Sequence, residues 1–190
     1  MTGPTETAPA AVLAAWDETA ELRAVRLALP PAFAAQHVAP GQVVKAHTRD
    51  GEAFFALSTA PSPDGRVELL VKRGGRVADA VVAAAVPGAT LEVTPPFGEG
   101  FPIAEARGRD VLLFAAGSAI APVRALVQAI VGRRDEFGRV TLFYGQRHGA
   151  GFAYRGEHLA WERKGVRVIL CPSGADDAWT GVRGRVQEVA

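Results

Sequence analysis

Residues 111–122 read Val-Leu-Leu-Phe-Ala-Ala-Gly-Ser-Ala-Ile-Ala-Pro, and this stretch decides the fold class of the chain. The apolar run Val111–Ala115 is typical of a parallel strand that is buried on both faces. Pro122 fits the first turn of a helix, where a missing N–H costs nothing. The stretch therefore predicts a strand, a turn at Gly117 and a helix over Ala121–Val131.

Strand and helix patterns alternate after this stretch. We expect a strand at Val140–Tyr144, a helix at Phe152–Lys164 and a strand at Val166–Leu170. This alternation indicates a parallel α/β layer. Ligands of such sheets bind at the carboxyl ends of the strands, and a helix N-terminus offers free N–H groups to phosphate. The turn at Gly117 is thus either a nucleotide-binding loop or a plain strand-to-helix connection.

Short β-like segments separated by Gly and Pro dominate the chain before residue 100. The segment pair around Asp50-Gly51 is a strong hairpin signal, and Arg76–Ala85 reads as a helix. Several short strands at this spacing predict a small antiparallel barrel. The expected strands are Ala11–Trp16, Leu22–Leu29, Val43–His47, Ala53–Ser58, Val67–Lys72 and Leu91–Thr94. A Pro- and Gly-rich linker over residues 95–102 separates them from the α/β pattern.

Composition excludes several classes of function. The 190 residues carry a net charge of +1 with no basic run, so we expect no nucleic-acid or membrane partner. Cys171 is the single cysteine, which leaves too few ligands for an iron–sulfur cluster. The four histidines lack metal-site spacing, and we expect no metal site. Residues 1–9 show no secretory signal pattern, so we expect a cytoplasmic location.

Other chemistries of the Gly117 turn fit the sequence less well. The turn has neither the G-x-G-x-x-G spacing nor the Gly-Lys-Ser/Thr of a P-loop. A hydrolase nucleophile elbow at Ser118 needs glycine two places to either side, where the chain has Ala116 and Ile120. We therefore expect no catalytic serine.

Four motifs together resemble the ferredoxin–NADP reductase superfamily. Gly117–Pro122 is similar to its Gly-Ser/Thr-Gly-Ile-Ala/Ser-Pro loop, and Leu142–Arg147 to its second-strand Tyr-Gly-x-Arg motif. Pro96–Phe101 resembles the inter-domain Pro-x-Gly-x-Gly-Phe segment, notably of dihydroorotate dehydrogenase electron-transfer subunits. Tyr154, Trp161, Asp176-Asp177-Ala178-Trp179 and Gly181–Gln187 resemble an uncharacterised plant and bacterial branch of fruit-protein reductase-like sequences.

The resemblance implies an antiparallel Greek-key β-barrel over residues 1–100 that binds FAD. It implies a truncated Rossmann-like parallel α/β domain over residues 101–190 that binds NAD(P)H. No catalytic side chain is required, because the cofactors carry the chemistry. The implied FAD residues are Phe55, Ala56, Leu57, Ser58, Val71, Lys72, Gly74 and Gly75. The implied dinucleotide residues are Gly117, Ser118, Ala119, Pro122, Gly145 and Arg147, the last beside the adenosine ribose or a 2′-phosphate.

The chain departs from the family pattern in its flavin signature. The family's Arg-x-Tyr-Ser becomes Ala53-Phe54-Phe55-Ala56, which loses the arginine and the hydroxyl groups. A lost charged hydrogen bond commonly costs about 1.5–3 kcal/mol. The family's Gly-x-x-Ser phosphate motif is Gly75-Arg76-Val77-Ala78 here, and we expect Arg73 or Arg76 to supply replacement charge.

A second departure lies beyond the third parallel strand. The family continues through a further strand and a Cys-Gly motif that this sequence lacks, and Cys171 is not its equivalent. A sheet without its closing strand exposes an edge. Three explanations follow: the sequence is a fragment, the domain has decayed, or a second copy of the chain or a partner subunit covers the edge.

Two hypotheses for function follow. The first is an FAD-dependent NAD(P)H oxidoreductase or electron-transfer module, with an unidentified acceptor for which a protein is a candidate. The alternative is a degenerate, non-catalytic nucleotide-binding or regulatory subunit that retains the fold.

Overall fold

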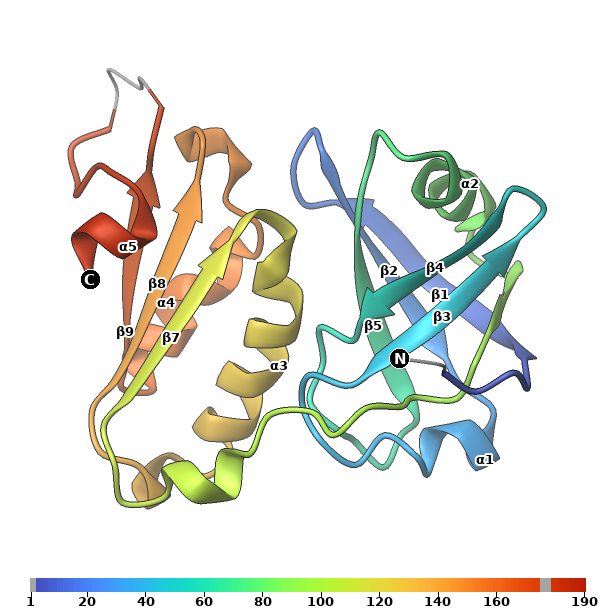
Figure 1. Ribbon diagram of the computed structural model, residues 1–190, viewed down its shortest axis with the longest axis horizontal. Coiled ribbons are helices and arrows are strands. Elements are labelled where there is room, and N and C mark those ends of the chain that lie inside the picture. The colour runs from blue at the N-terminus through green and yellow to red at the C-terminus, as the bar shows by residue number, and fades with distance from the viewer. Residues whose placement is uncertain (1–2, 175–178) are drawn as a thin grey trace.

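The computed structural model describes residues 3–174 and 179–190, which form two sheets side by side (Figure 1). Asp176, Asp177 and Ala178 of the motif noted above lie outside the described residues. The first sheet has six antiparallel strands: β1 (Ala8–Asp17), β2 (Leu22–Ala28), β3 (Val43–Thr48), β4 (Gly51–Ala56), β5 (Arg66–Lys72) and β6 (Thr90–Val93). The predicted strands are thus confirmed, and β1 begins three residues earlier than expected.

The six strands follow the order β4-β3-β6-β1-β2-β5, so the sheet has β4 and β5 at its edges. An isolated bridge between Leu57 and Leu69 joins these edges, in place of the continuous ladder that would close a barrel. The hairpin signal is confirmed, because Thr48 pairs with Gly51 across the turn. We call the line between β4 and β5, where Leu57 meets Leu69, the seam.

Two helices belong to this first part. The helix α2 (Arg76–Ala84) contacts β3, β4, β5 and β6, and its Val81 side chain is fully buried among theirs. The short helix α1 (Pro31–Ala34) was not predicted from the sequence. Proline suits a first helical turn, and α1 places Phe33 in the core.

The second sheet has three parallel strands within the described residues, in the order β7 (Val111–Ala116), β8 (Val140–Gln146) and β9 (Val166–Pro172). Behind it in Figure 1 lie α3 (Ile120–Val131) and α4 (Arg155–Arg163), and α5 (Val186–Val189) lies in front. Short 3₁₀ turns occur at Ile103–Ala106, Gly117–Ala119, Arg134–Glu136 and Gly149–Gly151. The predicted alternation of strands and helices is confirmed.

The start of α4 differs from the expectation. The helix begins at Arg155 instead of Phe152, because Tyr154 has the left-handed backbone angle φ = 57° that ends regular helix. Phe152 is fully buried and packs edge-on against Tyr144.

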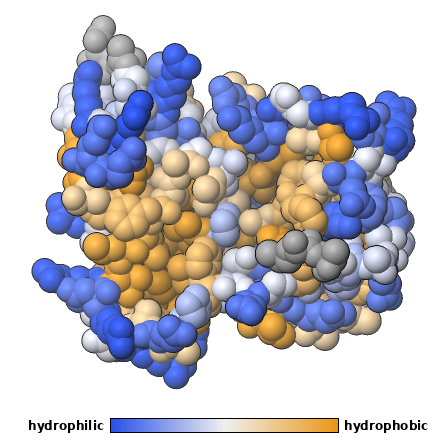
Figure 2. Space-filling model, viewed as in Figure 1, coloured by the Kyte–Doolittle hydropathy of each residue, from blue (hydrophilic) through white to orange (hydrophobic). Residues whose placement is uncertain are grey.

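The front of the parallel sheet is apolar and open. Leu112 and Phe114 of β7 are 60% and 48% exposed, and the Phe114 ring stacks on Phe143 at 5.3 Å. Figure 2 shows this region as the broad orange surface on the left half of the molecule. Leu113 and Ala115, which alternate with them, are buried against α3. The strand is therefore covered on its rear face and exposed on its front face, where the sequence had predicted burial on both.

The two parts share one hydrophobic cluster. Leu22 of β2 and Leu70 of β5 pack in the same cluster as Ile120 and Tyr154 of the α/β part. Val25 and Leu27 instead belong to the core of the antiparallel part. Because β2 is buried on both sides, it connects the two cores. Among the described helices, none is long and apolar enough to cross a membrane.

His37 makes the stability of the protein sensitive to acid. Burial lowers the pKa of its imidazole to about 4, whereas an unfolded histidine titrates near 6.5. Between these values the unfolded chain binds the extra proton, so the free energy of unfolding falls as the pH decreases, by about 3 kcal/mol in total. We expect His37→Gln to flatten this dependence in urea unfolding at pH 6.5, 5 and 4.

The exposed His148 provides the matched control. His148→Gln makes the same chemical change at an exposed position, away from the buried His37. If the free energy of unfolding depends on pH equally in the wild type and in His37→Gln, His37 is not the source of the acid sensitivity.

Candidate functional site

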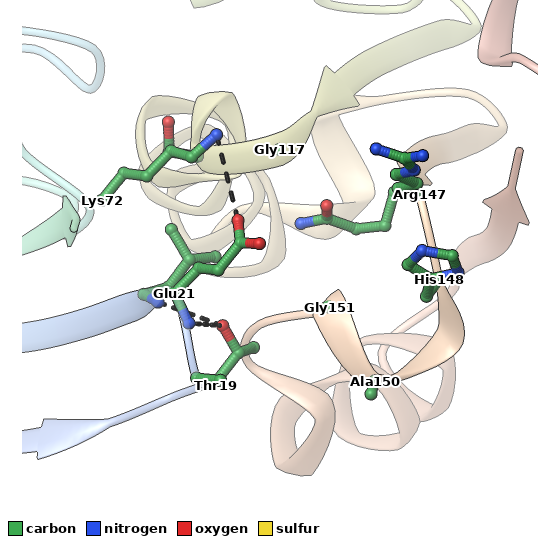
Figure 3. A pocket seen from close by; sticks show the side chains of 12 residues that line it. Thr19, Glu21, Lys72, Gly117, Arg147, His148, Ala150 and Gly151 are labelled. Atoms are coloured by element: carbon green, nitrogen blue, oxygen red, sulfur yellow. Dashed lines mark hydrogen bonds and ion pairs between the residues drawn. The ribbon is translucent and has the colours of Figure 1, made fainter. Parts of the chain in front are cut away.

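A hollow of about 300 Å³ opens at the carboxyl ends of β7 and β8, between the two parts of the molecule. The turn between β1 and β2 and the end of β5 line one side of it. The other side is formed by Gly117, Ser118 and the segment from Gln146 to Gly151. Figure 3 shows Lys72 and Glu21 facing Arg147 and His148 across this space. The structure therefore brings Lys72, expected near FAD, together with the expected dinucleotide loop.

Gly117 makes the floor of the hollow accessible. Its φ angle is +58°, and a Cβ atom placed on it would meet no atom within 4 Å. The residues Gly117–Ala119 form a 3₁₀ turn that leads directly into α3, which has Pro122 in its first turn. N–H groups at such a start have no partner within the helix and can receive an anion.

Tyr144 holds this turn in place. Its hydroxyl donates to the carbonyl of Gly117 at 3.3 Å and accepts from Gln146 Nε2 at 2.9 Å and from the N–H of Ala153 at 3.3 Å. The ring is fully buried, and burial raises the pKa of the hydroxyl. The second-strand motif contains Tyr144 but assigns it no role. The signal that could have found one is a tyrosine in a buried strand, because a buried hydroxyl needs partners.

Basic side chains dominate the walls of the hollow. The cations Lys72 and Arg147 line it together with His148, and Glu21 is the acidic residue in its lining. The Lys72 ammonium lies 3.9 Å from the Glu21 carboxylate, and both side chains are mostly exposed, so their attraction is weak. Open glycine backbone beside these cations fits a phosphate group.

A second hollow of about 260 Å³ lies on the opposite side of Arg147. It shares Gly117, Gln146 and Arg147 with the first, and Cys171, Ser173 and Arg185 complete much of its wall. Val186 of α5 packs directly on Gly145, where a Cβ atom would overlap it. Arg147 therefore stands between two hollows that meet over the turn at Gly117.

Three of the residues expected to contact flavin are fully buried. Leu57 and Val71 lie in the core of the antiparallel part, and the Ser58 hydroxyl donates to the carbonyl of Glu68 at 2.9 Å. Phe55 is half-buried and packs against the same core. Ala56 is half-buried, while Lys72, Gly74 and Gly75 are exposed.

The turn at Gly74-Gly75 is open to a ligand. Gly74 has φ = +97°, and a Cβ atom added to it would meet no atom within 4 Å, but its N–H already donates to Asp79 at 2.9 Å. Arg73 is held by Asp17 at 2.7 Å and by the carbonyl of Ala20. Arg76 is exposed and makes no ion pair with a described residue. Of the two arginines expected to supply charge, Arg76 is the one without an ion pair to a described residue, and its guanidinium lies near Gly51 at the β3–β4 turn.

Polar contacts join the two parts beside this site. Glu18 accepts the N–H of Tyr154 at 2.7 Å, and Gln128 accepts the N–H of Ala60 at 3.0 Å. Arg124 of α3 is bonded to Glu68 of β5 and to the carbonyl of Ser58. Burial raises the pKa of the Glu68 carboxyl, and the charges of Arg124 and Arg26 act against that shift. Sequence reasoning missed Arg124, whose signal was a charge within the apolar helix Ile120–Val131.

Comparison with known proteins agrees with this geometry. The family described as oxidoreductase NAD-binding domain matches residues 113–190, which include the turn at Gly117 and both hollows' α/β walls. The gamma subunit of sulfhydrogenase 1 from Pyrococcus furiosus is 33% identical over 154 residues, which are 78% of this chain and 52% of that protein.

Solved structures share the whole arrangement of two sheets. The ferredoxin reductase of carbazole 1,9a-dioxygenase superposes with a TM-score of 0.80 at 22% identity, over 97% of this chain and 56% of its own. A ferredoxin–NADP⁺ reductase from Neisseria gonorrhoeae with bound FAD and NADP gives a TM-score of 0.77 at 17% identity, over 96% and 74%. The chain therefore has the fold of the ferredoxin–NADP reductases, and its second part matches their kind of NAD-binding domain.

The chain spans about half the length of the first curated relatives that it matches, 52% and 51% of their sequences. The fold class expected from the motifs is confirmed, as an antiparallel six-stranded part followed by a parallel α/β part.

Proposed function

We propose that the chain is an FAD-dependent NAD(P)H oxidoreductase or electron-transfer module of the ferredoxin–NADP reductase superfamily, with a protein as its electron acceptor. We place the boundary between its FAD-binding and NAD(P)-binding domains at residue 100. The observation that carries the proposal is the open backbone at Gly117, facing Lys72, Arg147 and His148 in one hollow.

The two hollows would bind different parts of the dinucleotide. Gly117, Ser118 and Ala119 would receive its pyrophosphate on backbone N–H groups, beside Pro122 in the first turn of α3. Gly145 and Arg147 would hold the adenosine end next to the second hollow. Once bound, flavin and nicotinamide supply the redox chemistry, and the side chains bind and orient them.

The flavin would lie along the outside of β4 and the turn after β5. Phe55 and Ala56 offer half-buried surface there, whereas Leu57, Ser58 and Val71 would act through the backbone they fix. Lys72, Gly74, Gly75 and Arg76 would receive the phosphates. To bind a phosphate, the N–H of Gly74 must leave Asp79 or be shared between Asp79 and the phosphate. We therefore expect FAD to bind more weakly than it does with the full family signature.

The alternative, a non-catalytic subunit that retains the fold, is favoured by one set of observations. Ala53 and Ala56 lack the family's polar groups, and Asp79 already occupies the N–H of Gly74. Both hypotheses predict dinucleotide binding, and they differ in the flavin.

The visible absorption spectrum of the purified protein separates these hypotheses. We expect bound or added FAD to give a yellow complex whose colour bleaches on addition of NADH or NADPH. A colourless protein that binds NAD(P)H but takes up no added FAD would establish the non-catalytic alternative instead.

Substitution of Gly117 tests the dinucleotide site. Gly117→Ala places a methyl group in the hollow, and the left-handed backbone costs about 1–2 kcal/mol for a residue with Cβ. We expect the dissociation constants of NADH and NADPH, measured by isothermal titration calorimetry, to rise at least tenfold.

Gly108→Ala is the matched control, because Gly108 has φ = +71° and equal space for a methyl group. The two variants should lose similar stability, and only Gly117→Ala should lose binding. If both variants bind NADH and NADPH equally well, the phosphates of the dinucleotide do not bind at the turn of Gly117.

We also propose that a second copy of the chain covers the exposed edge of the parallel sheet. The N–H of Val111 bonds β8, so the backbone groups of Leu112 and Phe114 point to the open edge. Two such edges related by a two-fold axis at Leu113 can pair antiparallel, each copy matching Leu112 with the other's Phe114. Burying one such side chain contributes about 1.5–3 kcal/mol.

Light scattering tests this dimer. We expect a concentration-dependent mass that Phe114→Lys reduces to that of one chain, since a charge at the edge blocks pairing. Leu159→Lys is the control, because Leu159 of α4 is a similarly exposed apolar residue at 55%. A wild-type chain that stays monomeric at every concentration would contradict the proposal.

A further inference from the structure

Arg124 lies where helix α3 meets the seam of the antiparallel part. The helix starts three residues after Gly117 and carries Arg124 one turn further on, with the side chain 8% exposed. A buried guanidinium needs partners for its donors, and this one finds them in three segments far apart in sequence.

The first two partners belong to the two sides of the seam. Arg124 Nη1 donates to the carbonyl of Ser58 at 2.8 Å and to Glu68 Oε1 at 3.2 Å. Ser58 follows β4, and Glu68 lies in β5. Since an isolated bridge from Leu57 to Leu69 joins the strands at this point, one guanidinium group from α3 fastens both edges.

The third partner fixes the direction of the side chain. Arg124 Nε and Nη2 donate to the carboxylate of Glu157 in α4, at 3.0 and 2.7 Å. The ring of Tyr154 lies 4.4 Å from the guanidinium carbon and covers its face. Hydrogen bonds on two edges and an aromatic ring on one face fix the planar guanidinium group in a single orientation. The ammonium group of a lysine cannot reproduce this arrangement.

Both oxygens of the Glu68 carboxylate are also bonded to arginine side chains. The carboxylate is fully buried, and its second oxygen accepts from Arg26 at 3.1 Å. The Ser58 N–H and hydroxyl both donate to the backbone carbonyl of Glu68. Any shift of Arg124 is therefore passed to Ser58 and Glu68 together.

Each segment that Arg124 joins continues into the proposed cofactor site. Ser58 is two residues after Ala56, Glu68 is four residues before Lys72, and α3 begins at the turn of Gly117. We propose that Arg124 is a positioning residue, which rests on the function proposed above. It fixes the separation of the dinucleotide turn from the flavin segments, and so the approach of nicotinamide to flavin.

The test uses a variant without an unpaired buried charge. Arg124→Met with Glu68→Gln removes both members of the buried pair, and Glu157 can turn to solvent because its side chain is 34% exposed. Arg155→Met is the control, since Arg155 is an exposed arginine at the start of α4 without an ion pair to the described residues.

Three readouts are expected to separate positioning from general stability. In the cofactor-free full chain, hydrogen exchange should accelerate at least fivefold both in residues 56–60 and in residues 117–121. The dissociation constants of NADH and NADPH should change less than threefold. The rate of flavin bleaching at saturating NAD(P)H should fall at least tenfold, with loss of the long-wavelength charge-transfer absorbance.

Each other outcome has a definite meaning. Exchange that accelerates in one segment alone, or in neither, overturns the coupling, even in a wild type that takes up no cofactor. An unchanged bleaching rate, or binding that weakens as much as the rate, overturns the positioning role. Failure of the wild type to bind NAD(P)H or FAD refutes the proposed function and leaves exchange to decide the coupling. Arg155→Met should match the wild type in all three readouts.

Discussion

A guanidinium group cannot be buried without partners for its donors, and Arg124 meets this constraint by drawing α3, α4 and the seam together. Removing one member of a buried pair typically costs about 3–5 kcal/mol, because the other charge stays behind. The contacts of Arg124 and the apolar cluster shared by the two parts together hold the two sheets against each other. Leu22 and Leu70 fill the space between the parts. Apolar contacts tolerate a range of positions, whereas the directional hydrogen bonds of a guanidinium group tolerate few.

The site follows from this placement. The turn at Gly117 is open because a glycine occupies a left-handed position, and it keeps its shape because the Tyr144 hydroxyl bonds its carbonyl. Neither feature alone brings the turn near Lys72, and the contacts between the two parts, such as that between Arg124 of α3 and Glu68 of β5, do so. The cationic hollow is thus a property of two segments brought together, each of which alone is an exposed turn.

Local patterns in the sequence predicted much of the fold, because they report on neighbouring residues. The apolar run Val111–Ala115 and the Asp50-Gly51 turn specify their own backbone, and both elements are present. Pattern could not predict that Tyr154 takes φ = 57°, since the partner that fixes its N–H, Glu18, lies far earlier in the chain. The same reason explains why α4 begins later than expected.

The candidate site was predictable only in part, for a related physical reason. The motif residues Gly117 and Arg147 line the hollows where the sequence placed them, but motif matching could not tell that Leu57 and Ser58 point into packed interior. Alternation along β4 leaves open which face is the core until its neighbour β3 is known. The inward Val44 and Ala46 pair with Phe55 and Ala53, which puts Leu57 on the same inner face, whereas Ser58 is buried by its contacts with Glu68 and Arg124. The contacts of Arg124 escaped notice because charge in a helix usually indicates a solvated face.

The pairing of β1 with β6 has a consequence for the order in which the chain can fold. Ala8 to Ala11 pair with Val93 to Thr90, so β1, the first strand of this sheet in chain order, waits for β6, its last. Until then β1 offers an unpaired edge with apolar residues, a state prone to aggregation. The hairpins β1–β2 and β3–β4 can form early, because their strands are neighbours in sequence. The edge of β1 that receives β6 is therefore the part of the antiparallel sheet that stays unpaired longest.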